Sequence, residues 1–448
     1  MNILGAIDAR IKAAHPDHRA IFKGMAWISF FVVIGKLMGA AKEMAVAYRY
    51  GVGAEVDAYL FVLNFISWPV GVWFSVLTVV LVPLVAKIRQ EAIDELQRFR
   101  AELFSAAILL GLVLAALAFL GLPMVLRSQW AGLPLATAAI AVHAIPVLVL
   151  LLPLGIIISL FSAWMLAAGQ HANTLLEGVP ALVIGIVVLI SAGSGIQSLV
   201  WATVAGFGAH LISLAIPLAY RREIELPRFT FRSSQWPLFW RGFGIMLAGQ
   251  ALMSLVAIID QFFAVYVGTG AVATLSYANR IVSLLLTLGG TVVSRATLPI
   301  FSAAHRQGGT QVQRVAAQWA GLMFMVGIIS FCVSWWLAPH AVKFIFERGA
   351  FTAQDSSAVS EVLRYALVQL PFYFSGLVLV SGLVSRGMHK LVALSAIVNL
   401  VVKIGGNCLL APAMGLKGIA LATAMMYVVS FLTLYKLTNV IEDRKGIT

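Results

Sequence analysis

The sequence predicts an all-α polytopic membrane protein with about twelve transmembrane helices. Three observations support this fold class. Of the 448 residues, 61% are hydrophobic and only 11% are charged, whereas a soluble domain is about 25% charged. Apolar stretches of the length that crosses a bilayer, about 20 residues, follow one another along the chain. Finally, short motifs recur at a near-constant offset, which predicts two similar halves.

The apolar stretches are separated by short polar segments, and each is long enough for one membrane-spanning helix. In chain order they cover about 22–48, 56–86, 103–122, 138–168, 174–193, 196–219, 240–266, 272–302, 316–338, 357–385, 391–411 and 416–437.

An internal repeat organises these stretches. The segment Gly51-Val-Gly-Ala54 recurs as Gly268-Thr-Gly-Ala271 at an offset of 217, and Pro83 and Pro123 recur as Pro299 and Pro339 at an offset of 216. Six helices per half is an even number, so both halves have the same orientation. We therefore expect two six-helix lobes related by a pseudo-twofold axis along the membrane normal, with cargo bound between the lobes.

The repeat also sets the expected domains. Residues 1–219 form an N-terminal six-helix lobe, residues 220–241 a cytoplasmic linker, and residues 242–448 a C-terminal six-helix lobe. The linker is the longest polar stretch of the chain, and we expect it to act as a tether.

The formal charge of +13 follows the positive-inside rule rather than a nucleic-acid-binding pattern. With both termini placed in the cytoplasm, most loop arginines and lysines fall on the cytoplasmic side. The opposite side holds only Arg127, Lys343, Arg348 and Lys417. The sequence therefore predicts a multi-pass protein of the bacterial inner membrane that contacts anionic lipid and binds no nucleic acid.

Seven basic residues lie inside the predicted spans. A charge at the bilayer centre costs at least ~2.5–3.5 kcal/mol, so these side chains are expected to face an interior cavity. A cationic cavity favours an anionic cargo. The seven residues are Lys36, Lys42, Arg49, Arg280, Arg295, Arg364 and Lys403.

The first span carries two candidate cargo contacts. Lys36, Gly39 and Glu43 share one helical face, since seven residues make nearly two turns. We expect Lys36 to contact cargo with Glu43 tuning its charge, and Lys42 to be a further cargo contact; alternatively, each charge pairs with another helix. Asp57 opens the second span, where a carboxylate complements the helix dipole.

The C-terminal half supplies the other candidates. A guanidinium suits bidentate contact with phosphate, so Arg280 is the strongest phosphate-binding candidate, followed by Arg295. Asp260 lies in mid-span and must bind a cation, pair with a base or stay protonated. Glu361 and Arg364 are spaced to pair with each other, and Thr352 with Asp355 has the spacing of a capping box.

Five motifs in the right order resemble the MurJ/MviN family of lipid-linked sugar flippases. They are Gly53-Ala-Glu-Val-Asp57-Ala-Tyr59, Tyr277-Ala-Asn-Arg280, Thr297-Leu-Pro299, Arg348-Gly-Ala-Phe-Thr-Ala-Gln-Asp355 and Gly415-Leu-Lys-Gly-Ile-Ala-Leu-Ala-Thr423. The resemblance covers essentially the whole chain. It implies the fold of the multidrug/oligosaccharidyl-lipid/polysaccharide exporter superfamily, with Lys36, Lys42 and Arg280 at positions where the family places basic residues around a central cavity.

Three departures from the family pattern bear on the cargo and the energy source. The arginine pair common in the second span is absent from Ile66–Gly71. Some members bind sodium through carboxylates of the seventh and eleventh helices; here Asp260 and Asn399 match, but Lys403 stands where the second carboxylate would be. The chain has twelve predicted spans, whereas peptidoglycan members usually have fourteen.

The resulting prediction is a flippase that moves a polyprenyl-pyrophosphate-linked sugar precursor by alternating access. The precursor is either lipid II-like or an exopolysaccharide or O-antigen repeat unit. No covalent catalysis, cofactor or metal is expected, and the protein is expected to be a monomer. The alternatives are a cation-coupled multidrug exporter of the same superfamily and a membrane polysaccharide polymerase or ligase. A drug exporter would favour an acidic or neutral cavity, and a polymerase needs a large external loop.

The candidate residues fall into two groups. The substrate-binding group is Lys36, Lys42, Arg280 and Arg295; the charge-coupling group is Glu43, Asp57, Asp260, Asn399 and Lys403.

Overall fold

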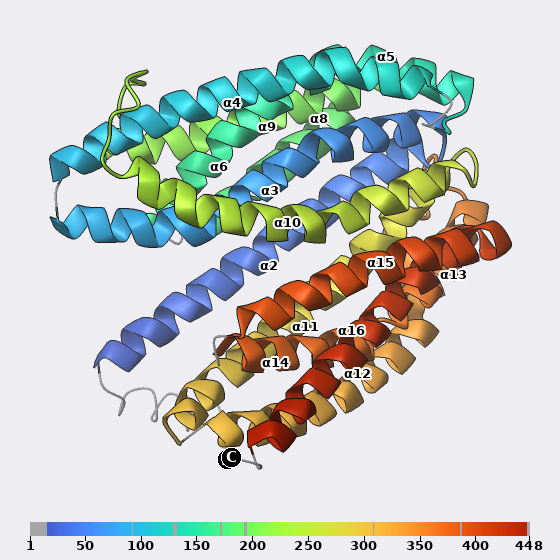
Figure 1. Ribbon diagram of the computed structural model, residues 1–448. Helices are drawn as coiled ribbons and strands as arrows, with labels where there is room; N and C mark the ends of the chain where they lie inside the picture. The colour runs from blue at the N-terminus through green and yellow to red at the C-terminus, as the bar shows by residue number, and fades with distance from the viewer. Residues whose placement is uncertain are drawn as a thin grey trace, which may run out of the picture. The chain divides into compact units, whose positions relative to one another are not determined.

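The computed structural model describes residues 16–445, apart from 92, 129–131, 171–172, 192–194, 308 and 386–387. Within helices, side chains are not described at 16–29, 90–91, 245, 248, 291–292, 294–307, 309–314, 389–390 and 437–445. In this described part of the chain every regular element is a helix (Figure 1). The all-α prediction is thus confirmed.

The helices of the first half coincide with the predicted apolar stretches. They are α2 (Pro16–Tyr50), α3 (Ala54–Glu91), α4 (Ile93–Arg127), α5 (Leu135–Leu148), α6 (Leu151–Ala167), α7 (Asn173–Leu176), α8 (Val179–Ile190) and α9 (Gln197–Tyr220).

The second half repeats this order. Its helices are α10 (Trp236–Val265), α11 (Ala271–Gln307), α12 (Gly309–Phe346), α13 (Ala353–Leu367), α14 (Leu370–Ser385), α15 (His389–Met414) and α16 (Leu416–Lys445).

The sequence repeat has a counterpart in the backbone. The fourth predicted stretch is interrupted at residues 149–150, between α5 and α6, and the tenth at residues 368–369, between α13 and α14. Gly51 and Gly268, which match in the repeat, both adopt a positive φ, at 59° and 136°. The same breaks and turns therefore recur at nearly the same offset as the motifs.

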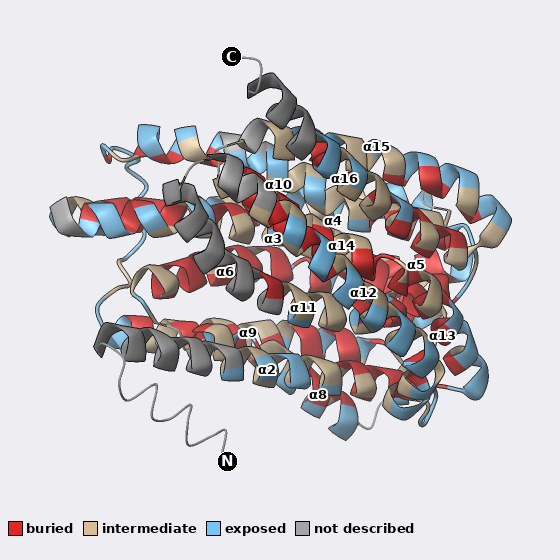
Figure 2. Ribbon diagram, turned by 90° about the horizontal axis from the view of Figure 1, so that it is seen from below, coloured by how far each residue is buried: buried red, intermediate tan, exposed pale blue. Residues whose placement is uncertain are grey.

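The helices have the length and composition of membrane spans. Among the described residues, eight are long and apolar enough to cross a membrane, or up to eleven if each of three bent pairs forms one span. Large apolar side chains stay exposed on them, such as Leu120, Trp336 and Leu409 at 64%, 71% and 77%. Figure 2 shows exposed and buried residues sharing individual helices. Such faces suit lipid tails; the count of twelve spans stays a prediction.

The chain forms two compact units by internal contacts. The first contains the described residues of Met1–Ala45, Trp73–Ala116 and Val147–Gly244, and the second those of Val46–Val72, Leu117–Pro146 and Ile245–Thr448. The second unit thus combines the ends of α2 and α3 with helices of the C-terminal half. The expected division at residues 219 and 242 stays a prediction.

Within the second unit, three segments meet at what we call the motif junction, residues 48–57, 268–277 and 348–351. The amide of Ala350 donates to the carbonyl of Tyr48 at 2.7 Å. The hydroxyl of Tyr277 donates to the carbonyl of Gly51 at 3.2 Å, and its ring packs on Phe351. Two of the five motifs that resemble the family, 277–280 and 348–355, therefore contact each other directly, and each also binds the segment just before a third motif, 53–59.

The turn before α13 depends on one glycine and one cap. Gly349 has φ 61°, and a Cβ there would lie 2.3 Å from the carbonyl oxygen of Tyr48. After the turn, the Thr352 side chain accepts from the amide of Asp355, whose carboxylate accepts from the amide of Thr352. The predicted capping box is therefore confirmed, and it begins α13 directly beside the junction.

Replacing Gly349 by alanine should destabilise the protein. The substitution combines a left-handed backbone, which costs on the order of 1–3 kcal/mol for a non-glycine residue, with a clash against backbone of the first half. Thermal unfolding in detergent should show a lower midpoint. Gly376→Ala in α14 is the matched control, because its Cβ would meet nothing within 4 Å. Equal midpoints for the two variants would contradict this account of the junction.

Candidate functional site

The first group of candidate residues lies on α2, inside the first compact unit. Close packing fixes this part of α2 against α8 and the residues just before it. A Cβ at Gly178 would lie 3.3 Å from the Cα of Gly35, and one at Gly185 would lie 3.5 Å from the Cα of Lys42. These two glycines are seven residues apart, as are Gly35 and Lys42, so small residues on one face let the two backbones approach.

Lys42 and Glu43 pair with each other. The Lys42 Nζ lies 2.7 Å from the Glu43 Oε1, and their side chains are 15% and 11% exposed. Sequence spacing assigned Glu43 to the face of Lys36, but its carboxylate forms an ion pair with its immediate neighbour. A charge pair between adjacent residues lowers the cost of placing Lys42 in a mostly apolar helix.

Lys36 is exposed, and the carboxylate of Glu177 lies within its electrostatic range. Glu177 sits between α7 and α8 and also accepts from the Asn173 amide at 3.2 Å. It was not among the sequence candidates. The sequence could have indicated Glu177, because it is a carboxylate inside the apolar stretch 174–193. Asp260 was selected for the same reason, as a carboxylate inside an apolar span.

Asp57 is nearly fully buried, at 2% exposure. Its carboxylate accepts hydrogen bonds from the backbone amides of Gly270 and Ala273, the latter at 2.7 Å. These amides are at the N-terminus of α11, where unpaired N–H groups and the helix dipole attract negative charge. Asp57 was expected to serve its own helix; instead it caps a helix of the other half, within the second unit.

Arg280 lies one turn further along α11. Tyr277 and Ala278 are buried, whereas Asn279 and Arg280 are exposed. The anchored tyrosine thus fixes the helix that carries the exposed guanidinium. Arg295 belongs to the same helix, but its side chain lies outside the described residues.

Asp260 of α10 forms a buried ion pair with Lys403 of α15. The Lys403 Nζ lies 2.7 Å from the Asp260 Oδ1, and Lys403 is fully buried at 0% exposure. The ammonium also donates to the Ile419 carbonyl at 3.0 Å and to the Thr423 hydroxyl. Its three donors are therefore matched by three acceptors, which is the condition under which a buried charge is tolerated.

A polar stripe on α15 completes this site. The Asn407 amide donates to the Asp260 Oδ1 at 2.9 Å, whereas the Asn399 amide donates to the Ser430 hydroxyl at 3.1 Å. The sequence candidates included Asn399 and missed Asn407. Asn399, Lys403 and Asn407 recur at four-residue spacing on an apolar helix, so the third member was visible in the same pattern.

Other basic residues in the spans have local contacts. The Arg364 Nε donates to the Trp335 carbonyl at 3.4 Å and its guanidinium lies over the Trp335 ring. Glu361, its expected partner, pairs with Lys417 at 2.5 Å instead. The Arg49 guanidinium lies 5.7 Å from the centre of the Tyr50 ring. These contacts account for both arginines structurally.

Comparison of the fold with solved structures shows the same architecture elsewhere. The chain is similar to a lipid II flippase MurJ in an inward closed conformation, with a TM-score of 0.81 and 18% identity, over 92% of this chain and 87% of that one. An inward-facing multidrug resistance MATE family transporter matches with a TM-score of 0.77 and 16% identity, over 92% of this chain and 96% of that one. At these identities, the matches establish the fold.

Sequence comparison points to one of these two groups. The "Probable lipid II flippase MurJ" of Helicobacter pylori strain J99 is 28% identical over 192 residues, 42% of this chain and 41% of that protein. Its counterpart in Bdellovibrio bacteriovorus is 24% identical over 227 residues, 50% of this chain and 43% of that protein. These alignments thus span about two fifths of the length of each relative.

The family model described as "Lipid II flippase MurJ" matches residues 46–441, most of the chain. This match includes the motif junction, Asp260, Arg280 and the Lys403 site. The chain belongs to the lipid II flippase MurJ family.

Proposed function

We propose that this protein is a flippase that moves a polyprenyl-pyrophosphate-linked sugar precursor, lipid II or a close analogue, across the bacterial inner membrane. The observation that carries the proposal is the family match over residues 46–441. Flipping is a transport step, so the proposed activity involves no covalent reaction. Membership of a flippase family follows directly from that match, and the apolar spans are typical of a multi-pass membrane protein.

The charges inside the spans support an anionic cargo. Lys36 and Arg280 are both exposed; Arg280 lies in a candidate span of α11, and Lys36 lies in the 35-residue helix α2. Lys403, in contrast, is fully buried against a carboxylate. Exposed bases at membrane depth fit a water-filled cavity that receives phosphate. We assign phosphate contact to Lys36 and Arg280, with Lys42 and Arg295 as further members.

The alternative function is that of a cation-coupled multidrug exporter, because the fold is also similar to that of a MATE family transporter. A cation-coupled exporter needs a carboxylate that can accept a cation during the cycle. The carboxylate of Asp260 already pairs with Lys403 and Asn407. We therefore propose that the Lys403 ammonium is a built-in countercharge for Asp260, and that transport requires no sodium.

Alternating access requires contacts that close one side of the transporter in one state and break when that side opens. The Asp57 cap on α11 is suited to such a role, because it joins a segment of the first half to one of the second through hydrogen bonds from backbone amides. We assign Asp57 to this coupling. The motif junction is proposed to lie on the outer side, with the linker and both termini in the cytoplasm.

The proposed phosphate contacts predict a loss of function without a loss of protein. Arg280→Ala and Lys36→Ala should each abolish complementation in a bacterium depleted of its own lipid II flippase, at normal membrane levels. Arg280→Lys should keep partial activity, because the bidentate guanidinium is replaced by a point charge. Lys343→Ala is the control, since this 71% exposed side chain lies at the end of α12. Full complementation by both alanine variants would refute the assignment.

Cargo identity is tested separately, in proteoliposomes. Purified protein should accelerate flipping of fluorescent lipid II, and of a polyprenyl-pyrophosphate carrying another sugar if the pyrophosphate is the main recognition element. Transport of a cationic drug without flipping of either lipid would favour the exporter alternative.

The built-in countercharge predicts a rescue pattern. Breaking a buried ion pair by removing one partner costs ~3–5 kcal/mol, whereas neutralising both costs less. Lys403→Gln and Asp260→Asn should each lower stability and transport, and the double variant should recover part of both. Cys408→Ser, which changes an exposed side chain of the same helix, serves as the control. Wild-type flipping should be equal with and without sodium; a sodium requirement would contradict the countercharge role.

The orientation predicts where single cysteines react. In a Cys332→Ser, Cys408→Ser background, Ser234→Cys should be protected from a membrane-impermeant maleimide in intact cells, and Gln354→Cys should react. Both positions are exposed, so burial does not limit either reaction. Labelling of both cysteines, or of Ser234→Cys alone, would contradict the orientation.

A further inference from the structure

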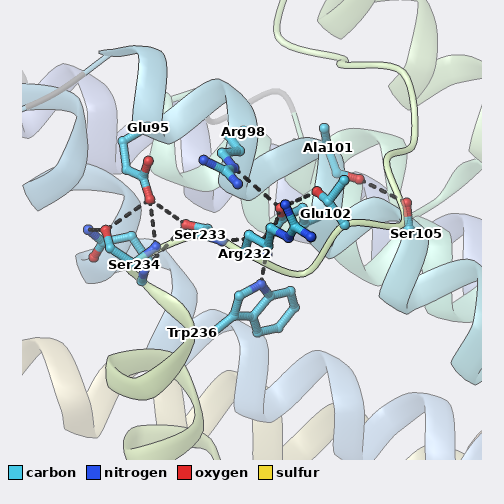
Figure 3. Close-up of polar contacts among 11 residues, drawn as sticks. Glu95, Arg98, Ala101, Glu102, Ser105, Arg232, Ser233, Ser234 and Trp236 are labelled. Carbon is cyan, nitrogen blue, oxygen red and sulfur yellow. Dashed lines mark hydrogen bonds and ion pairs between the residues drawn. The ribbon is translucent and has the colours of Figure 1, made fainter.

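The polar segment between α9 and α10 is folded onto the start of α4 rather than extended as a tether (Figure 3). Glu102 of α4 is fully buried and accepts from the amides of Arg232 and Ser233, each at 2.9 Å. It also accepts from the Thr230 hydroxyl and from the Trp236 indole at 2.8 Å. One carboxylate of α4 thus binds three residues of the segment and the first residue of α10.

Two further carboxylates fix the ends of this segment. Glu95 accepts from the Ser233 hydroxyl and the Ser234 amide, each at 2.7 Å. Glu223 pairs with Arg89 at 3.0 Å and with Arg100. Phe231 is held at φ 50°, a left-handed conformation that non-glycine residues rarely adopt. The surrounding contacts therefore impose one conformation on residues 221–235, which we call the pinned loop.

The pinned loop displays large apolar side chains outward. Leu226, Phe229 and Phe231 are 82%, 59% and 44% exposed. Burying such a side chain is favourable by roughly 1.5–3 kcal/mol. The polar contacts hold these side chains outside the protein interior, so this free energy is gained only if an apolar surface covers them. The flanking helices carry exposed aromatic residues as well, Tyr220 at 87% and Trp240 at 54%.

The basic residues beside these apolar side chains indicate which kind of surface packs on them. Arg222, Arg228 and Arg232 are exposed, and their guanidinium groups form no ion pair with the described residues. The loop contains two carboxylates: Glu223 is already paired with Arg89 and Arg100, and Glu225 lies within electrostatic range of Arg100. Cationic heads next to leucine and phenylalanine match the boundary between anionic headgroups and acyl chains.

Position in the chain supports a lipid surface over a protein partner. The loop directly follows the span α9, which ends at Tyr220, and directly precedes the apolar helix α10, which begins at Trp236. It is attached to α4, another candidate span. All three attachments hold the loop next to hydrocarbon, at the level where tyrosine and tryptophan are enriched.

We propose that the pinned loop is a lipid-surface anchor, with Leu226 and Phe229 inserted into the headgroup boundary and Arg228 and Arg232 bound to anionic phospholipid phosphates. Glu102 positions the anchor by holding the backbone of residues 230–233. The anchor fixes the first compact unit to the membrane surface, and it contains none of the residues assigned to cargo.

Nitroxide labelling in lipid nanodiscs tests the anchor. The label is placed by Phe229→Cys in the Cys332→Ser, Cys408→Ser background, and its relaxation by oxygen is compared with that by a water-soluble nickel chelate. In discs containing phosphatidylglycerol the label should favour oxygen several-fold more than a label at Gln354→Cys, an exposed position in the first turn of α13. In pure phosphatidylcholine discs the preference should fall.

Charge removal separates the headgroup contact from general burial. Arg228→Gln with Arg232→Gln should lower the partition of the loop into anionic discs roughly 30-fold, from the usual contribution of a basic residue at such a surface. Arg127→Gln with Lys343→Gln removes the same charge elsewhere and should change nothing. A Phe229→Cys label as accessible to nickel as the Gln354→Cys label would overturn the anchor. An unchanged depth in the double arginine variant would overturn the phospholipid contact.

Discussion

The cost of placing charge in a medium that cannot solvate it governs this structure. The fully buried ammonium of Lys403 is accommodated because one carboxylate, one carbonyl and one hydroxyl surround it. Asp260 in turn depends on Lys403 and Asn407. This set connects α10, α15 and α16 inside one compact unit, so the packing of three helices is tied to a single balanced charge. Glu102 follows the same rule in the first unit, where backbone amides add to the countercharge of Arg98.

The rule also separates structural charges from functional ones. Arg364 and Lys403 have carboxylate, carbonyl or aromatic contacts that explain them. Lys36 and Arg280 are exposed side chains of long helices, where they are open to water or cargo. The proposed phosphate contacts follow from that difference. A lipid with a pyrophosphate headgroup would offer these bases negative charge, which is consistent with the membership of the chain in a flippase family.

The motifs that resemble the family have a largely mechanical explanation. Gly349 allows close approach to Tyr48, Tyr277 reaches the carbonyl of Gly51, and Asp57 caps α11. Each contact joins a segment of one half to a segment of the other, within the second unit. Hydrogen bonds and helix caps of this kind can break and re-form, which suits the proposed role of the junction in alternating access.

The sequence by itself determined the helical class, the approximate extent of nearly every helix and the internal repeat, because hydrocarbon imposes a minimum length and composition on each span. It also identified Asp260 and Lys403 as ionisable residues that need a partner, since a charged group in an apolar helix must be compensated wherever it lies. Only the tertiary structure decided who the partners are. Asn407 rather than Asn399 reaches Asp260, Glu43 pairs with Lys42, and the polar segment 221–235 folds onto α4. These choices depend on how helices distant in sequence are rotated against one another, and local periodicity contains no such information.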